Sequence, residues 1–470
     1  MTIWRPNLTG QSGPKYLAIA NEIEMAIAEG TLRNGDKLPP QRDLAYDIGV
    51  TLGTVTRAYA EAERRNLVKG ETGRGTFVSP QERSKGSPLS PPSERGEGMD
   101  MARNFAFPFL NPDLKEALLQ LADYEDLSAL SNYVPPEGLY AHRQAGAKLF
   151  QLFNVETCAD SIVITCGAQH AINVALQGCF NRGDVIAVDA LTYPSLLSSA
   201  SRLGLKLLPI EAGRAEGGGI GAMRADLLEE ACRLGKVQGV FLIPNHQNPT
   251  SHTMSVAERE ALAAVCARVG LIVIEDDPYT PFLSGIGPSF VSLLPDQTVS
   301  IATPSKILCP SVRAAFMHAP PHLLPDLRNI IGESTWMASP ITTQLVANWV
   351  NEGVAQDVIA SKRQELARRY SLLQEALKGY SLQGGADKVL AWLPLPEHLN
   401  PASIEAELAA HSVSVLASHH FQLYSREPKA GLRLSLGTIE NSRSYAVALQ
   451  ILKKVLDRTY SGGLANVPLG

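Results

Sequence analysis

Short, strongly apolar runs alternate with helix-length segments over most of this sequence. Five of the runs are rich in β-branched residues and apolar on both faces, which is typical of strands that are covered on both sides. These runs lie at residues 161–165, 185–189, 237–244, 271–277 and 299–303. Between them, residues 168–180 and 255–270 have the length and spacing of helices. The alternation predicts an α/β domain with a mostly parallel sheet and helices on both faces.

The first eighty residues follow another pattern, that of short amphipathic helices followed by a hairpin. Pro14 and Gly30 bracket the first helical stretch, and Thr51 can cap the third. We expect helices within residues 15–30, 38–50 and 51–66, and two β-like pieces at residues 67–78. The buried stripe of the third helix would consist of Val55, Ala58, Tyr59 and Ala62. This order of elements is typical of a winged helix-turn-helix, which reads DNA with the start of its second motif helix.

A polar stretch separates these two parts. SPQERSKGSPLSPPSERGEG, at residues 79–98, is rich in Ser, Pro, Gly and charge and has almost no apolar residues. Such a composition cannot bury enough surface to offset the entropy of ordering. We therefore expect three parts, at residues 12–78, 79–103 (a flexible linker) and 104–470.

Composition narrows the class of protein. The 470 residues are 45% hydrophobic, enough for a large core, and the net charge of −5 favours neither a nucleic-acid binder nor a membrane-surface protein as a whole. The six cysteines are scattered, without metal-ligand spacing, and are typical of reduced thiols, so no metal site is expected. The sequence has no secretion signal and no run of about 18 uncharged apolar residues. We expect a cytoplasmic protein without a membrane partner.

Candidate DNA contacts lie at the start of the third helix and at the hairpin tip. Thr51, Thr54 and Arg57 are placed near the exposed end of the helix, and Arg74 stands next to Gly73 in the turn. A basic residue on a slim loop suits a phosphate or a narrow minor groove. Such helices also occur in small bundles, and a Gly-Arg-Gly turn is often only a turn. Residues 1–80 hold ten Lys and Arg against nine Asp and Glu, so the prediction depends on the order of motifs.

TPSKILCPSVR, at residues 303–313, follows the fifth apolar run. Lys306 alone would be interpreted as a surface lysine. At the carboxyl edge of a sheet, however, the hydroxyls of Thr303 and Ser305 and the guanidinium of Arg313 suit a dianionic phosphate beside a reactive amine. Pyridoxal phosphate, a phosphorylated aldehyde, needs both a group of side chains that binds its phosphate and an amine that reacts with its aldehyde.

That cofactor also needs an acid for its pyridine nitrogen, a donor to its phenolic oxygen, a loop for its phosphate and an aromatic ring. Residues of these kinds lie at the end of the other apolar runs or just after them: Asp276 with Tyr279, Asn248, the loop of Gly167, Ala168 and Gln169, and Tyr193. Each has a structural alternative, namely a helix cap for Asp276, a turn for Asn248, a tight connection for Gly167 and packing for Tyr193. Their shared place at strand ends favours one site.

The N-terminal part resembles the winged helix of GntR-type transcription regulators. LPPQRDLAYDIGVTLGTVTRAYAEAERRNLVKGETGRGTFV carries the likeness, which covers residues 12–78. It implies contacts with double-stranded operator DNA from Arg42, Thr51, Thr54, Arg57, Gly73 and Arg74. Leu52 and Gly53 stand where many members have a polar residue, so the operator sequence does not carry over.

Residues 104–460 are similar to fold type I pyridoxal-phosphate enzymes of the class I/II aminotransferase family, with a small C-terminal lobe. The likeness implies that Lys306 forms the internal aldimine and that Asp276 pairs with the pyridine nitrogen. It implies phenolate contacts from Asn248 and Tyr279, and phosphate contacts from Thr303, Ser305, Arg313 and residues 167–169. It also implies a substrate-carboxylate contact from Arg433, and a homodimer with shared sites in which Tyr133 reaches the partner subunit's phosphate. The family's Asn-Pro-Thr-Gly has Ser251 in place of its glycine.

Together the two parts resemble the MocR subfamily of bacterial transcription regulators. The resemblance implies a regulator that binds DNA and senses pyridoxal phosphate, an amine or an amino acid through external aldimine formation. Two alternatives stay open at this point. One is a working aminotransferase with an added DNA-binding domain, and the other is a winged-helix scaffold over a domain that binds no cofactor.

Overall fold

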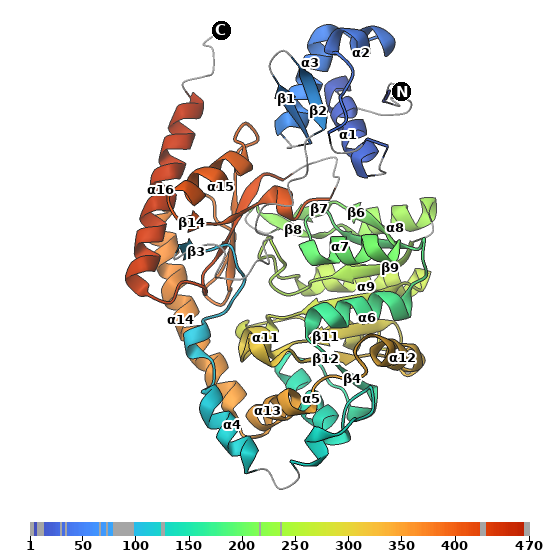
Figure 1. The fold of residues 1–470 in the computed structure, drawn as a ribbon, viewed down its shortest axis with the longest axis vertical. Helices are drawn as coiled ribbons and strands as arrows, with labels where there is room; N and C mark the ends of the chain where they lie inside the picture. The colour runs from blue at the N-terminus through green and yellow to red at the C-terminus, as the bar shows by residue number, and fades with distance from the viewer. Residues whose placement is uncertain are drawn as a thin grey trace. The chain divides into compact units, whose positions relative to one another are not determined.

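The computed structural model divides the chain into two compact units, residues 1–97 and 98–470 (Figure 1). The described residues are 4–6, 14–28, 31–32, 35–64, 67–71, 74–78, 98–123, 127–215, 218–235, 237–423 and 429–464. Residues 79–97 of the expected linker lie outside these ranges.

The first unit is a three-helix bundle with a hairpin. Its elements are α1 (Lys15–Ala28), α2 (Gln41–Asp47), α3 (Leu52–Arg64), β1 (Val68–Glu71) and β2 (Gly75–Val78). The two strands pair antiparallel, from Val68 opposite Val78 to Glu71 opposite Gly75. Thr51 Oγ1 accepts the backbone N–H of Thr54 at 3.2 Å and so caps α3 as expected. The winged-helix order of elements is confirmed.

The core of this unit confirms the predicted face of α3. Val55, Ala58, Tyr59 and Ala62 are at most 3% exposed and belong to one apolar cluster with residues of α1 and α2. The Tyr59 hydroxyl also donates to the carbonyl of Pro39 at 2.7 Å. This bond ties α3 to the segment that leads into α2, so it holds the two helices of the helix-turn-helix together.

The second unit is built on a mixed sheet in which β12 alone runs against its neighbours. Across the sheet the order is β4 (Ile162–Thr165), β12 (Ala315–His318), β11 (Thr298–Ala302), β10 (Ile272–Asp277), β9 (Val237–Leu242), β5 (Val185–Asp189) and β6 (Lys206–Ile210). All five strands expected from the sequence form. β6 and the antiparallel β12 were not predicted.

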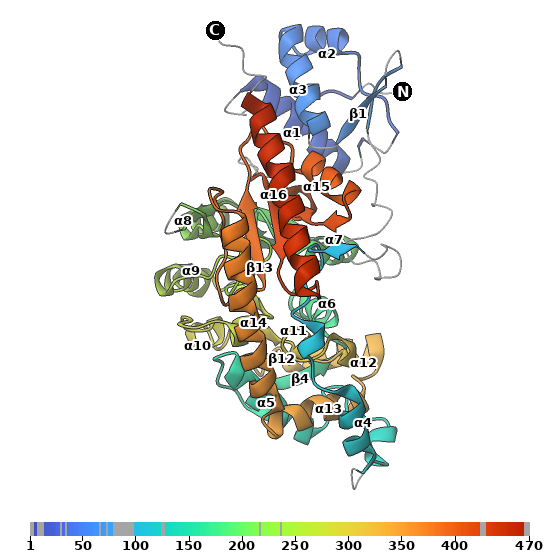
Figure 2. The ribbon, with the colours of Figure 1, turned by 90° about the vertical axis from the view of Figure 1, so that its left-hand side faces the viewer.

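Helices cover both faces of this sheet, as the alternating pattern predicted. One face carries α6 (Ala168–Cys179), α7 (Pro194–Leu203) and α12 (Leu324–Thr335) over a shared apolar cluster. The other carries α8 (Ala225–Leu234), α9 (Val256–Val269) and α10 (Phe290–Leu293). Figure 2 shows the two sets on opposite sides of the strands. The sheet is therefore buried on both faces, which explains its continuous apolar runs.

The remaining elements build the end of the domain and a smaller lobe. The third apolar cluster holds α4 (Leu114–Ala122), α5 (Tyr140–Leu152), α13 (Pro340–Asn351) and the long α14 (Val354–Ala376). The lobe contains β13 (Leu390–Pro394), α15 (Pro401–Ala410), β14 (Val413–Ser414), β15 (Leu416–Ala417), β16 (Gly431–Ser435) and α16 (Ser442–Leu464). β7 (Ala212–Arg214) and β8 (Ile220–Met223) form a separate hairpin.

One boundary differs from the expectation. Met99 and Asp100 form β3, which pairs with Val413 and Ser414 of β14 in the small lobe. The second unit thus begins at Gly98, so the expected linker ends at residue 97 and not at residue 103. The composition of residues 98–103 gave no sign of this, because their partner strand lies more than three hundred residues further along the chain. Among the described residues, no helix is both long and apolar enough to span a membrane.

Candidate functional site

The predicted site residues meet at the carboxyl edge of the large sheet. Asp276 is the second-last residue of β10, and Lys306 stands on the short helix α11 (Pro304–Ile307) directly after β11. Asn248 follows β9, Tyr193 follows β5, and Gly167 follows β4. These five strands run in the same direction, so their carboxyl ends lie on one side.

Lys306 has an amine that is easily deprotonated. Its Nζ donates to the carbonyl oxygen of Asn104 at 2.5 Å. Burial and the nearby charge of Arg433 lower the pKa of Lys306 to about 8, against an opposing effect of Asp276. Only the neutral form of an amine attacks an aldehyde, so this environment favours a reactive lysine.

Asp276 presents a carboxylate oxygen with an open hydrogen-bonding position. The residue is 6% exposed, and its buried Oδ1 has no hydrogen-bond partner among the described residues. Burial and the neighbouring Asp277 raise the pKa of Asp276 to about 7. Asp277, and not Asp276, accepts the backbone N–H groups of Tyr279 and Thr280 in the turn that follows β10. A buried, unpaired carboxylate is costly unless a ligand supplies a donor.

Arg433, on β16, closes the site from the small lobe. It is 4% exposed, and burial lowers its pKa to about 10. Nη1 donates to Asn248 Oδ1 at 3.1 Å and Nη2 donates to the carbonyl of Ala102, while the guanidinium lies 5.0 Å from the ring centre of Phe421. Asn248 is thus held by Arg433 through its oxygen, which leaves its amide NH₂ to donate.

Tyr279 lies at the centre of the same group. Its hydroxyl accepts a hydrogen bond from Asn104 Nδ2, and the ring of His246 lies 4.6 Å from its own. Burial raises the pKa of Tyr279, so it stays a neutral hydroxyl. Burial also lowers the pKa of His246 well below its usual value, which keeps that imidazole uncharged beside the ring.

A cradle for an anion forms where α6 begins. Gly167 precedes the helix with φ of 86°, and a Cβ there would lie 2.5 Å from Arg313 Nη2. That guanidinium donates to the carbonyl of Cys166 at 3.4 Å. Ala168 and Gln169 lie in the first turn of α6, where backbone N–H groups have no partner within the helix and favour negative charge.

Three hydroxyl groups that the sequence assigned to the cofactor also have partners in the structure. Thr303 Oγ1 donates to Ser305 Oγ at 3.0 Å at the start of α11. The Tyr193 hydroxyl donates to Gln169 Oε1 at 3.4 Å. Burial raises the pKa of Tyr193, and the charges of Asp276 and Arg433 also act on it. Tyr193 therefore borders both the phosphate end and the carboxylate end of the site.

Tyr133 is the one predicted residue of this domain that lies apart. Its side chain is 79% exposed and contacts Trp336, with 5.4 Å between the ring centres. The resemblance assigned Tyr133 to a partner subunit's phosphate, which is compatible with an exposed position. That role stays a prediction.

The predicted DNA-contacting residues of the helices lie on the first unit's surface. Arg42 on α2 and Arg57 on α3 are exposed, and the Arg57 guanidinium lies 4.2 Å from the ring centre of Tyr16. The hydroxyls of Thr51 and Thr54 are hydrogen-bonded at 2.9 Å. The two threonines thus stabilise the helix start that would enter a groove.

The wing carries the other predicted contact. Arg74 is exposed, and its guanidinium lies 5.8 Å from the ring centre of Phe77. Gly73 lies outside the described residues. The contacts of Arg42, Thr51, Thr54, Arg57 and Arg74 with DNA stay predictions.

Two family models match the chain. Residues 15–78 match the bacterial regulatory proteins of the gntR family. Residues 99–449 match aminotransferase class I and II. The HTH-type transcriptional regulator YdeF of Bacillus subtilis is 30% identical over 457 residues, with 97% of each chain covered. The chain belongs to the MocR subfamily of GntR-type transcription regulators.

Further relatives fit this MocR architecture. The vitamin B6 salvage pathway transcriptional repressor PtsJ of Salmonella typhimurium is 27% identical, with 92% of this chain and 96% of PtsJ covered. The solved structure of LysN, the α-aminoadipate aminotransferase of Thermus thermophilus, aligns with a TM-score of 0.70 at 23% identity, covering 82% of this chain and 97% of LysN. The fold type I assignment is confirmed.

The aminotransferase class I and II family and its fold imply pyridoxal 5'-phosphate as cofactor, and the site's chemistry fits that group. The open Oδ1 of Asp276 can accept from a protonated pyridine nitrogen, and the missing side chain of Gly167 lets the Arg313 guanidinium lie against the start of α6, where it could bind a phosphate. Asp276 and Arg433 both lie near enough to the Lys306 amine for their charges to shift its pKa. When bound, the cofactor supplies an aldehyde that condenses with amines and a ring that withdraws electrons.

Two residues of the site were not predicted. Asn104 holds both Lys306 and Tyr279, and His246 lies against Tyr279. Asn104 is 202 residues from Lys306 in the sequence, and no local pattern marks it. His246 stands two positions before Asn248 in HQNPT, so its place after a strand was the available signal.

Proposed function

We propose that this chain is a pyridoxal-phosphate-dependent transcription regulator that detects an amino compound and adjusts its binding to operator DNA. The observation that carries the proposal is the buried set of Lys306, Asp276 and Arg433 in a chain that also has a winged helix. Lys306 would hold the cofactor, Asp276 would keep its ring protonated, and Arg433 would bind the carboxylate of an amino acid. Such a regulator acts where bacterial DNA lies, in the cytoplasm.

The segment just after residue 97 supports a route from this site toward the DNA-binding unit. Arg433 donates to the carbonyl of Ala102, and Lys306 donates to the carbonyl of Asn104. Thr438 holds the carbonyl of Arg103 between them at 2.9 Å. A carboxylate bound at Arg433 would compete with the contact to Ala102, and a change in the bonding of the Lys306 amine would alter the contact to Asn104.

Effector binding would therefore release or re-form bonds to residues 102–104. These residues continue the chain that leads from the winged helix. Contacts that differ between the effector-free and the effector-bound states supply the free energy that allosteric coupling requires. A change of two charge-assisted hydrogen bonds, at about 1.5–3 kcal/mol each, is enough to shift an equilibrium by a factor of ten or more.

A homodimer with shared sites is part of this proposal. The exposed pair of Tyr133 and Trp336 is a large apolar surface for one chain to leave open. In a dimer, Tyr133 would reach the partner subunit's phosphate. Two winged helices would then bind two half-sites of an operator with matching symmetry.

The second candidate function is transamination. The same three residues are the ones that an aminotransferase needs, so the site favours the enzyme on chemical grounds. A winged helix, however, contributes nothing to metabolic turnover. An assay separates the two: the tag-free full chain is given pyridoxal phosphate, an amino acid and a 2-oxo acid. We expect spectral changes without sustained product. Multiple turnovers at about 1 s⁻¹ or faster would overturn the sensor proposal.

The assignment of Lys306 has its own experiment. The Lys306→Ala variant should lose the visible absorption band of lysine-bound cofactor. Lys378→Ala, which removes an exposed lysine of the same domain, should keep the band. A band that persists in Lys306→Ala, with borohydride reduction labelling another lysine, would contradict the assignment.

A further inference from the structure

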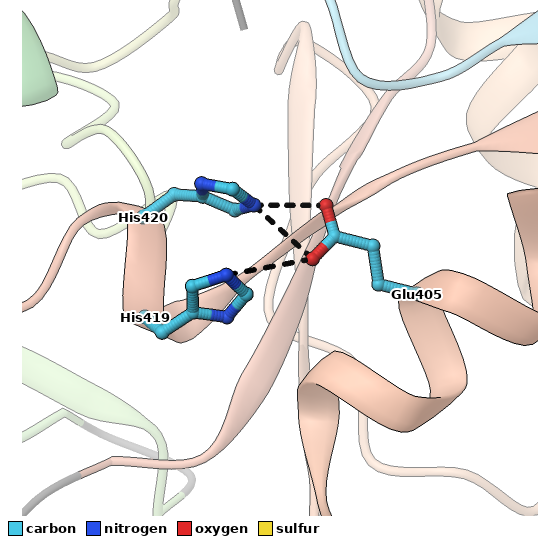
Figure 3. A group of neighbouring side chains, drawn as sticks. All are labelled: Glu405, His419 and His420. Atoms are coloured by element: carbon cyan, nitrogen blue, oxygen red, sulfur yellow. Dashed lines mark hydrogen bonds and ion pairs between the residues drawn. The ribbon is translucent and has the colours of Figure 1, made fainter. Parts of the chain in front are cut away.

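A histidine pair and a glutamate that are not among the cofactor-binding residues meet in the small lobe. Glu405 lies on α15, and His419 and His420 lie on the short 3-10 helix η7 (Ser418–His420). Figure 3 shows both imidazole rings directed at the one carboxylate. These groups come from two separate elements, so the fold, not sequence proximity, brings them together.

The spacing of the three groups is that of ligands around one ion. His420 Nε2 lies 2.9 Å and 3.1 Å from the two oxygens of Glu405. His419 Nε2 lies 3.8 Å from Oε2, beyond hydrogen-bonding distance. Tetrahedral Zn²⁺ with bonds of about 2.0–2.1 Å needs ligand atoms about 3.3 Å apart. The observed separations bracket this value, so small side-chain rotations would place all three on a metal.

A simple ion pair does not account for the second histidine. One imidazole is enough to pair with Glu405, and His420 already does so. The rings of His419 and His420 nonetheless lie 4.0 Å apart, centre to centre, with both turned to the same oxygens. The three side chains are 38%, 19% and 20% exposed for His419, His420 and Glu405, so an ion has access from solvent.

We propose that Glu405, His419 and His420 bind a divalent transition-metal ion, with Zn²⁺ as the best match. Two imidazoles and one carboxylate are the ligands that borderline first-row metals prefer, whereas Ca²⁺ and Mg²⁺ prefer oxygen alone. Water would fill the fourth position. The cysteine spacing considered from the sequence could not indicate this site, because it contains no cysteine.

The bound ion would fasten η7 to α15. The residue that follows His420 is Phe421, whose ring lies beside Arg433 and whose carbonyl accepts the backbone N–H of Thr192 at 2.9 Å. The metal site is therefore one residue from a wall of the proposed effector pocket. Because the ion binds the folded lobe and joins two elements, it should also raise the thermal stability of the protein.

The test uses the tag-free full chain, since a histidine tag would bind the same metals. After treatment with a chelator, the protein is titrated with ZnCl₂ against a chromophoric chelator, and separately with CoCl₂ followed by visible absorption. We expect one Zn²⁺ per chain at this site, a Co²⁺ spectrum typical of a four-coordinate site, and a higher melting temperature with Zn²⁺.

Variants locate the ion. Glu405→Gln, and His419→Gln combined with His420→Gln, should weaken Zn²⁺ binding by about 10–100-fold or more, since loss of even an outer-sphere partner costs that much. His411→Ala, which removes an exposed histidine next to α15, should bind like the wild type. Equal Zn²⁺ affinity in all three variants would overturn the proposal, as would a wild type that shows neither Co²⁺ absorption nor a Zn²⁺-dependent melting shift.

Discussion

Protonation of Lys306 should control how fast the cofactor-free protein captures pyridoxal phosphate. The pKa of this lysine is lowered to about 8, from an ordinary value of 10.5. A lowered pKa increases the neutral fraction at a given pH. At pH 7 about 9% of Lys306 would be neutral, against about 0.03% of an ordinary lysine, a difference of about 300-fold.

Stopped-flow absorption measures this directly. The rate of appearance of the lysine-bound band should rise about tenfold per pH unit below pH 8 and level off above it. Replacing Arg433 by Gln removes a nearby positive charge that helps to lower the pKa, so the midpoint should move to higher pH. A rate that keeps rising to pH 10, with the same profile in Arg433→Gln, would refute the reasoning.

Three further predictions concern the phosphate cradle, the ring contact and the DNA surface. Gly167→Ala puts a Cβ against Arg313 at a φ of 86°. We expect the free energy of unfolding to fall by about 1–2 kcal/mol and the cofactor to bind more weakly. An unchanged melting temperature would contradict this. Asp276→Asn keeps the shape but removes the charge, so cofactor affinity by fluorescence titration should fall by about 1.5–3 kcal/mol, and wild-type affinity would count against the pyridine contact. Arg57→Ala should weaken binding to all duplexes alike and reduce the salt slope by about one, whereas a loss confined to one sequence would indicate a base contact.

Much of the fold and of the cofactor site could be predicted because the signals are local. β5 was predicted at its observed bounds, and α6 ends within one residue of the expectation. A parallel sheet gathers the carboxyl ends of its strands, so residues such as Asp276 and Lys306, which stand at the end of an apolar run or just after one, lie at the same edge. The N-cap Thr51 and the buried face of α3 could be predicted for the same reason, because residue type and spacing within one helix determine them.

The parts that were missed depend on distant partners. β6 contains Pro209, which is unfavourable in a strand, and its pairing with β5 at the edge of the sheet permits it. β3 is paired with β14 of the small lobe, and Asn104, four residues after β3, contacts Lys306 across 202 residues of sequence. No window of sequence around these residues contains the information. The grouping of Glu405 with His419 and His420 was missed for the same reason.

The most direct test of a cofactor-dependent regulator is DNase footprinting on the DNA upstream of its own gene, with and without pyridoxal phosphate. For the wild type and for Lys378→Ala, we expect the pattern or the affinity to change when the cofactor is added. For Lys306→Ala, we expect the DNA to be bound without this response. A response of Lys306→Ala equal to that of the wild type, or a wild-type footprint that the cofactor leaves unchanged, would contradict the account.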